Sequence, residues 1–289
     1  MCELTPTKSG LFRFFSMERS KIRKPFVAGS FYPSDPKELK EQISSFIDKT
    51  AVKTNALACV LPHAGYIYSG RVAAQTVSRI LVKERVILLG PNHAGQGALV
   101  SMMAQGAWRT PLGDIQIDEK MAGALLEGSQ YLEDDPSAHA SEHSLEVELP
   151  ILQYFRSDFK IVPIALMTDD LKLLKELGRE IAAVAKTPEF KETVLIVASS
   201  DMTHYEPQSS AEKKDKEAID AILALDEDRL VEKIKKFDIT MCGASPVVVA
   251  LTIGKALGAR HATLVNYQTS ADAGADKESV VGYAGVIID

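Results

Sequence analysis

The chain has 289 residues, 46% of them hydrophobic and 25% charged, which is close to the average for globular proteins. Its formal net charge is −6, and this disfavours a dedicated nucleic-acid-binding protein, because such proteins usually carry a basic excess. No apolar run approaches the ~20 residues that a membrane-spanning helix needs. Cys2, Cys59 and Cys242 form no CxxC pair, so we expect free thiols in a reducing cytoplasm.

Residues 1–20 are predicted to be a loosely ordered N-terminal extension. The apolar stretch at residues 11–15 is interrupted by Arg13, and no small-residue cleavage site follows it, so a secretory signal is not expected. Residues 21–289 contain no internal repeat, low-complexity tract or linker-like change of composition. We therefore predict one domain over residues 21–289.

Short apolar or β-branched runs alternate with helical periods along this domain. The predicted strands are residues 57–61, 85–89, 98–103, 114–117, 160–165, 193–198, 261–267 and 280–288. The predicted helices are residues 71–82, 144–155, 171–185, 211–225, 228–236 and 246–257. Pro111 and Gly113 predict a turn between antiparallel strands. The alternation favours a three-layer α/β domain with a mixed, mostly parallel sheet and helices on both faces.

Polar residues follow three of the predicted strands directly. His63 follows the first, His93 follows the second, and Asp201 and His204 follow the strand at residues 193–198. Because ligands in open α/β sheets bind beyond the carboxyl ends of the strands, we expect these side chains to share one site. Imidazole is a good ligand for zinc, copper, iron and nickel, so a metal site is the natural hypothesis.

Cys242 lies between a charged helix and a strongly apolar helix. One interpretation is a small buried hydrophobic residue, which is a common role for a free cysteine. The alternative places Cys242 just before a helix that Ser245 caps and that has Pro246 as its first residue. A helix N-terminus lowers the pKa of a thiol, so this alternative predicts a reactive or metal-binding thiolate.

A second pattern competes for the metal site. His139, Glu142 and His143 fit the H-x-x-E-H motif of inverzincin metalloproteases, in which both histidines bind zinc. The helical period begins only after His143, so this local context disfavours the motif. Separately, His143 and Glu146 are three residues apart and would share one face of a helix, which makes them candidates for the wall of the main site.

Seven short motifs occur in an order that resembles the Memo family, whose prokaryotic members are labelled AmmeMemoRadiSam system protein B. The resemblance extends from about Arg23 to Asp289. The motifs are KPFVAGSFYP (24–33), PHAGY (62–66), GPNH (90–93), RTPLGD (109–114), EHSLEVELP (142–150), SDMTHY (200–205) and MCG (241–243).

The resemblance implies a fold like that of class III extradiol ring-cleaving dioxygenases, which use non-haem iron(II). By position, His63, His93 and Cys242 match the metal-binding residues of the family. Asp201 and His204 match additional site residues, and His143 falls in a motif near the same cleft. The resemblance also implies a functional link to a radical-SAM protein of the same system.

Cys242 takes the position where ring-cleaving dioxygenases have a carboxylate ligand. A thiolate shifts the preference toward copper(I) or zinc and toward redox chemistry of its own. The leading hypothesis is a cytoplasmic non-haem metal protein of redox or oxygenase type that acts on an unknown small substrate. Iron or copper is the favoured ion, and zinc is an alternative. His204 would act as acid or base, and Asp201 would orient it or join the metal ligands.

Two other functions are alternatives to this hypothesis. The first is a non-catalytic binding or scaffold module that holds a peptide or a small anionic ligand in the same cleft. The second is a metal-dependent hydrolase, which we rank behind both. The acidic charge and the lack of a long apolar run predict no nucleic-acid or membrane partner.

Overall fold

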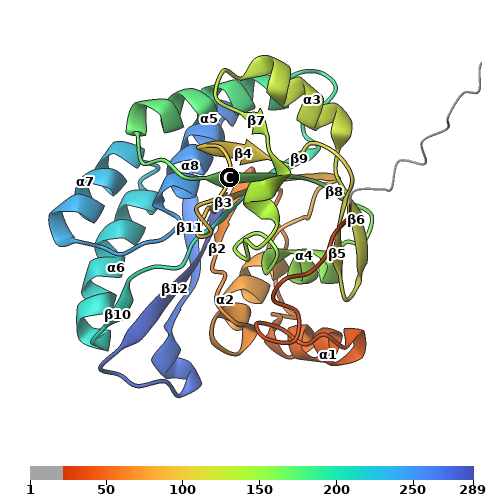
Figure 1. Ribbon diagram of the computed structural model, residues 1–289. Helices are drawn as coiled ribbons and strands as arrows, with labels where there is room; N and C mark the ends of the chain where they lie inside the picture. Colours follow the sequence, from red (N-terminus) through yellow and green to blue (C-terminus); the bar gives the residue numbers. More distant parts are fainter. Residues whose placement is uncertain (1–21) are drawn as a thin grey trace, which may run out of the picture.

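Nine strands form one sheet at the centre of residues 22–289, the part of the chain that the computed structural model describes (Figure 1). The extension predicted for residues 1–20 lies outside the described residues. Three further strands, β1, β5 and β6, form a separate small sheet. In chain order the strands of both sheets are β1 (Ile22–Arg23), β2 (Ala58–Leu61), β3 (Arg85–Pro91), β4 (Val100–Met102), β5 (Ala107–Thr110), β6 (Gly113–Gln116), β7 (Glu133–Asp134), β8 (Lys160–Leu166), β9 (Val194–Ser199), β10 (His204–Glu206), β11 (Ala262–Thr269) and β12 (Val280–Ile288).

The parallel part of the sheet lies at its centre. The strand order is β10-β12-β2-β9-β3-β8-β4-β7, and β11 pairs with β12. Strands β2, β9, β3 and β8 are mutually parallel, whereas β12 joins β2 and β4 joins β8 in antiparallel fashion. The sheet is mixed, as predicted. Because its central strands are parallel, their carboxyl ends reach the same edge, where loops from different parts of the sequence can meet.

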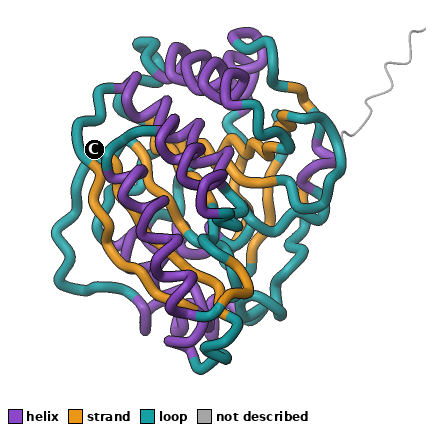
Figure 2. The backbone as a smooth tube through the Cα atoms, turned by 90° about the vertical axis from the view of Figure 1, so that its left-hand side faces the viewer, coloured by secondary structure: helices purple, strands orange, loops and turns teal. Residues whose placement is uncertain are grey.

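Helices cover both faces of this sheet, which confirms the predicted layers (Figures 1 and 2). Helix α8 lies on β2, β3 and β9 and packs against α5, while α2 lies against β2, β11 and β12 with α1 and α4 beside it. The helices are α1 (Pro36–Phe46), α2 (Tyr66–Ser78), α3 (Glu119–Gly128), α4 (Glu148–Phe155), α5 (Leu171–Ala185), α6 (Gln208–Leu223), α7 (Glu227–Phe237) and α8 (Ala244–Leu257), with the 3₁₀ helices η1 (Pro136–His139) and η2 (Ser270–Ala273).

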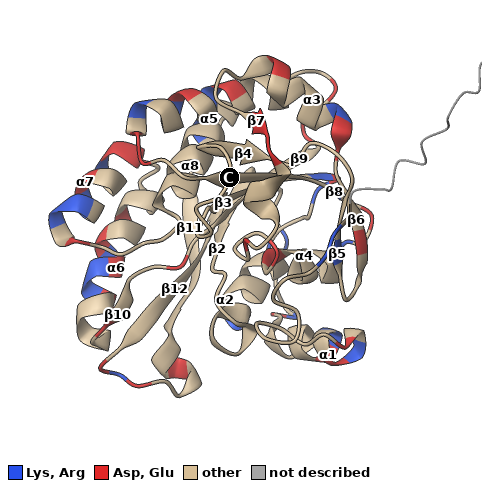
Figure 3. Cartoon of the chain, viewed as in Figure 1, with Lys and Arg blue, Asp and Glu red and all other residues tan. Residues whose placement is uncertain are grey.

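Burial explains the apolar runs of the central strands. Every residue of β2 and of β9 is buried, because helices cover both of their faces. The outer helices instead bury one stripe, as in α5, where Leu174, Leu177 and Ile181 face inward at helical spacing. Charged residues gather on these outer helices and are sparse on the central strands (Figure 3). No helix within residues 22–289 combines the length and the apolar character needed to cross a membrane.

Some local predictions differ from the structure. Helix α2 spans Tyr66–Ser78 rather than residues 71–82. The strand predicted at residues 98–103 is not part of the hairpin that turns at Pro111 and Gly113. In that hairpin β6 pairs with β5, whereas β4, which lies within residues 98–103, belongs to the central sheet. Helix α4 begins at Glu148, four residues later than predicted, so Glu146 lies outside it. Helix α8 begins at Ala244, earlier than predicted. Its N-cap residue is Gly243, so no side chain caps this helix.

Candidate metal centre

A cavity of about 720 Å³ opens at the carboxyl ends of the central strands. The loops after β2, β3 and β9 reach it, together with the segment before α4 and the turn before α8. Its walls include the six residues singled out for the site: His63, His93, His143, Asp201, His204 and Cys242. Among the described residues that line it, none is Lys or Arg.

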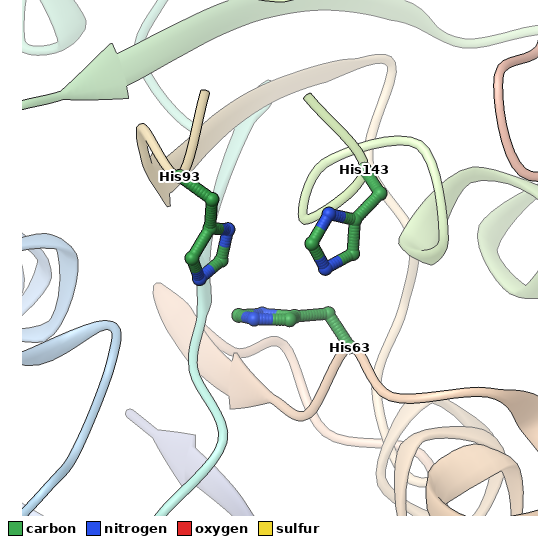
Figure 4. Close-up of side chains that lie close together, drawn as sticks. All are labelled: His63, His93 and His143. Carbon is green, nitrogen blue, oxygen red and sulfur yellow. The ribbon is translucent and has the colours of Figure 1, made fainter. Parts of the chain in front are cut away.

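Three imidazole rings converge in this cavity. One nitrogen from each of His63, His93 and His143 lies within 4.8 Å of the other two, a spacing suited to hold one metal ion. Figure 4 shows the rings pointing toward one another from three separate segments. The ring centroids of His93 and His143 are 4.9 Å apart and stacked, and His63 lies edge-on to both. His143, predicted as a catalytic or wall residue rather than as a metal ligand, therefore belongs to a group of three histidines that could hold a metal ion.

Glu142 orients His93 within this group. The buried Glu142 carboxylate accepts hydrogen bonds from the backbone N–H and the ring Nδ1 of His93. It also accepts one from the backbone of Ser144 at 2.9 Å. Burial alone would raise the pKa of Glu142, but these hydrogen bonds lower it to about 2. The carboxylate stays ionised and fixes Nδ1 of His93 as a donor, which leaves Nε2 with its lone pair for a ligand.

His63 is held both through its backbone and through its ring. Its backbone N–H donates to the Asp201 carboxylate at 2.8 Å, and its Nδ1 lies 2.8 Å from the Ser199 hydroxyl. Burial and the nearby rings of His93 and His143 lower the pKa of His63 well below its usual value. The ring is therefore neutral at pH 7, which is the form that binds metal.

Cys242 lies beside His63 on the side of Nε2. Its Sγ is 3.3 Å from Nε2 of His63, and it accepts a hydrogen bond from the backbone N–H of Asp201 at 3.3 Å. The loop reaches this position because Gly243 has no side chain, and a Cβ there would lie 2.2 Å from the carbonyl oxygen of Ser199. Whether Cys242 is a metal ligand stays a prediction.

The expected low pKa of Cys242 is wrong for the metal-free chain. Burial, followed by the charge of Asp201, raises the pKa of this thiol. The predicted Ser245 cap is also wrong, because Ser245 donates its hydroxyl to the carbonyl of Thr168 instead of to the helix. The physical reason is that desolvation of a thiolate outweighs the helix N-terminus when no cation lies close by.

His204 and Asp201 line the same cavity, and each is held by a different neighbour. The ring Nδ1 of His204 lies 2.9 Å from the carbonyl oxygen of Thr240. A carbonyl oxygen only accepts, so Nδ1 carries a proton, and in the neutral ring the lone pair lies on Nε2. Burial raises the pKa of Asp201 to about 6, although the hydrogen bond from the His63 backbone opposes this rise.

The H-x-x-E-H pattern divides between two environments. His139 is fully buried, and its ring packs edge-on to Trp108 with 5.6 Å between the ring centroids. His143 lines the cavity instead, and Glu142 is buried against His93. His139 ends η1 and is separated from His143 by an irregular segment, so the two histidines do not share a helix face. The described residues therefore contain no inverzincin site.

Glu146 does not line the cavity, contrary to the sequence-based prediction. Its buried carboxylate forms an ion pair with Arg23 and accepts hydrogen bonds from the backbone of Val27 at 3.0 Å and from the Tyr32 hydroxyl at 2.6 Å. These contacts hold the segment that carries Phe31, whose ring packs edge-on to His143 at 5.0 Å between centroids. Glu146 thus supports His143 indirectly, through the segment that carries Phe31.

Apolar and aromatic side chains surround the cavity mouth. Ile67, Tyr68 and Tyr205 line the cavity and are exposed to solvent. Tyr66 is buried instead, and its hydroxyl donates to the carbonyl of Val147 at 2.7 Å. These side chains are suited to contact an organic molecule. Of the three imidazoles, His63 is buried, His143 is half-buried and His93 is exposed.

Comparisons with known proteins show the family of this chain. The family described as Memo-like protein matches residues 23–287. A MEMO1 family protein of Methanopyrus kandleri is 42% identical over 280 residues, which cover 92% of this chain and 98% of that protein. One from Saccharolobus islandicus is 44% identical over 277 residues, covering 90% and 97% of the two chains. The chain belongs to the Memo family.

A solved structure shares the fold at much lower sequence similarity. The crystal structure of an uncharacterized protein of Escherichia coli K12 matches with a TM-score of 0.55 and 14% identity. The match covers 80% of this chain and 99% of that one. This likeness supports the α/β architecture.

Proposed function

We propose that the protein binds a first-row transition metal in this cavity and uses it to act on a small organic molecule. The observation that carries the proposal is the convergence of the His63, His93 and His143 nitrogens within 4.8 Å of one another on a cavity wall. Three neutral imidazoles bind zinc, copper or iron and leave coordination positions open. Iron and copper are the favoured ions, with zinc as the alternative.

The residues of the chain would divide the work as follows. His63, His93 and His143 would hold the ion, and Cys242 would add a soft donor next to His63. His204 would accept or donate a proton at Nε2, because its Nδ1 is committed to the Thr240 carbonyl. A bound ion of this kind polarises its ligands, and iron and copper add electron transfer. These roles favour redox chemistry. The molecule acted on would be uncharged or weakly charged, since no Lys or Arg lines the described part of the cavity.

Metal titration tests the proposal. Protein purified without a histidine tag should bind iron(II), copper(I) or zinc at micromolar or tighter affinity under reducing conditions. His63→Ala, His93→Ala and His143→Ala should each lose at least about tenfold, because each removes one ligand. His261→Ala is the matched control, since it removes an exposed imidazole outside the cavity. Absence of micromolar binding in the wild-type protein overturns the proposal.

Two further variants define the ligand set and the chemistry. A large loss of affinity in Cys242→Ala with none in His143→Ala would assign the third position to the thiolate. Oxygen uptake that requires both metal and an added small molecule, and that is lost in His204→Ala, would support the oxidoreductase assignment. Saturable peptide binding that survives metal removal, without such uptake, would favour a binding module.

A further inference from the structure

One serine hydroxyl behind the metal centre contacts three polar groups at once. The Oγ of Ser199 lies 2.8 Å from Nδ1 of His63, 2.8 Å from the carbonyl oxygen of Ser144 and 2.8 Å from Oε1 of Glu148. Ser199 ends β9, and Glu148 begins α4. The hydroxyl therefore connects a candidate metal ligand to a carboxyl group in the core.

Counting hydrogen atoms limits how these contacts are made. A hydroxyl has one proton to donate, and the Ser144 carbonyl can only accept. If Ser199 donates to that carbonyl, its other two neighbours must both donate to Ser199. This requires a proton on Nδ1 of His63 and a proton on the Glu148 carboxyl. Any other assignment leaves two acceptors facing each other at 2.8 Å.

The surroundings of Glu148 favour its neutral form independently. The residue is fully buried, and Ser199 is its only hydrogen-bond partner within residues 22–289. Its second oxygen, Oε2, has no partner there, and it forms no ion pair with a Lys or Arg of that part of the chain. Burial raises the pKa of Glu148 well above its usual value, although the hydrogen bond with Ser199 opposes this rise and the charge of Asp201 adds to it. An ionised carboxylate would be costly in such a place.

We propose that Glu148 is a protonated carboxylic acid that, through Ser199, holds His63 with its proton on Nδ1 and presents Nε2 to the metal. Glu148 and Ser199 are positioning residues, since neither of them lines the cavity. The role given to Nε2 rests on the proposed metal-binding function, whereas the proton positions are properties of the metal-free chain. The arrangement parallels the carboxylate of Glu142 behind His93, but here a neutral acid acts through a hydroxyl.

Infrared spectroscopy tests the state of Glu148 without any metal. At pH 7 the wild-type protein should show the carbonyl stretch of a protonated carboxyl group, and this band should disappear in Glu148→Gln. The glutamine amide still offers a donor to Ser199, so this variant should fold and keep its zinc affinity within about threefold. A wild-type spectrum with no band that Glu148→Gln removes overturns the proposal.

Nitrogen-15 NMR of the histidine rings tests the link to His63. In the metal-free wild-type protein, Nδ1 of His63 should be protonated and Nε2 should not. Ser199→Ala should release this preference and weaken zinc binding about tenfold, in the range found when support behind a ligand is lost. Ser78→Ala is the matched control, because it removes another buried serine hydroxyl bonded to a backbone carbonyl far from the cavity.

The two measurements separate this proposal from the metal-binding function. A proton on Nε2 of His63 in the wild-type protein contradicts the positioning role even if metal binds tightly. Failure of the wild-type protein to bind iron(II), copper(I) or zinc, with Nδ1 protonated and the Glu148 band present, contradicts the proposed function and leaves the positioning of His63 supported.

Discussion

Glu142 holds His93 at two points, through the backbone N–H and through the ring Nδ1, which lies 3.0 Å from Oε1. The two residues are 49 positions apart in the sequence, and the carboxylate is fully buried. A side chain held in this way can rotate little, so its free nitrogen points in a defined direction. Support of this kind commonly raises the affinity of a histidine for metal.

We expect Glu142→Gln to weaken zinc binding by about 10–100-fold, the range typical for loss of a carboxylate behind a ligating histidine. The amide lacks the charge that favours a proton on Nδ1 of His93. Competition titration against a zinc indicator measures the change. Glu127→Gln is the control, because Glu127 is exposed on α3. Equal affinities for both variants would show that Glu142 does not support the metal.

A pair of histidine variants separates the cavity from the H-x-x-E-H alternative. His93→Ala should reduce metal affinity by well over tenfold, because it removes a ligand. His139→Ala should change affinity by less than about threefold, since the His139 ring packs on Trp108 outside the cavity. Circular dichroism of both variants controls for folding. Strong loss in His139→Ala with none in His93→Ala would contradict the site described here.

The Cys242 thiol should be slow to react in the metal-free protein at pH 7. Its pKa is raised, so the thiolate fraction is small and grows about tenfold for each pH unit until the pH reaches the pKa. We expect alkylation by iodoacetamide to keep accelerating above about pH 10, where an ordinary thiol with a pKa of ~8.5 is almost fully ionised and its rate levels off. Peptide mass spectrometry assigns the modified residue. A rate that levels off below pH 8 would instead indicate a thiolate stabilised at the helix start.

Removal of Glu146 should destabilise the protein strongly. Glu146→Ala leaves Arg23 buried without its ionic partner, which typically costs about 3–5 kcal/mol in the free energy of unfolding. The comparison is Asp114→Ala, which breaks a more exposed pair with Arg109 and should cost less than about 1 kcal/mol. Urea denaturation measures both. Similar costs for the two variants would mean that the Arg23–Glu146 pair contributes no more than a surface pair.

Much of the fold follows from the sequence because its main signals are local. A strand covered on both faces must be apolar throughout, and β2, β3 and β9 could be predicted for that reason. Helix α5 has the predicted bounds, Leu171–Ala185, because its apolar residues repeat at helical spacing and Asp170 caps it. Since parallel strands end at one edge, the sequence also indicated that His63 and His93 would meet.

The inner contacts of the site depend on residues far apart in the sequence. The segment at residues 140–147 has no strand or regular helix, so no periodicity indicates where its side chains point. Close approach of this segment to β3 requires Gly90, where a Cβ would lie 2.6 Å from Leu145. Only the folded chain places Glu142 against His93 and Glu146 against Arg23.

The sequence by itself determined which strands are buried and which histidines lie at their ends. The tertiary structure alone decided that Ser199 and Glu148 lie behind His63, and that the Cys242 thiol has a raised pKa. The reason is that apolar burial acts through the repeating geometry of strands and helices, which a sequence displays directly. Hydrogen bonds and desolvation depend instead on the atoms that packing brings together, and these come from segments tens of residues apart.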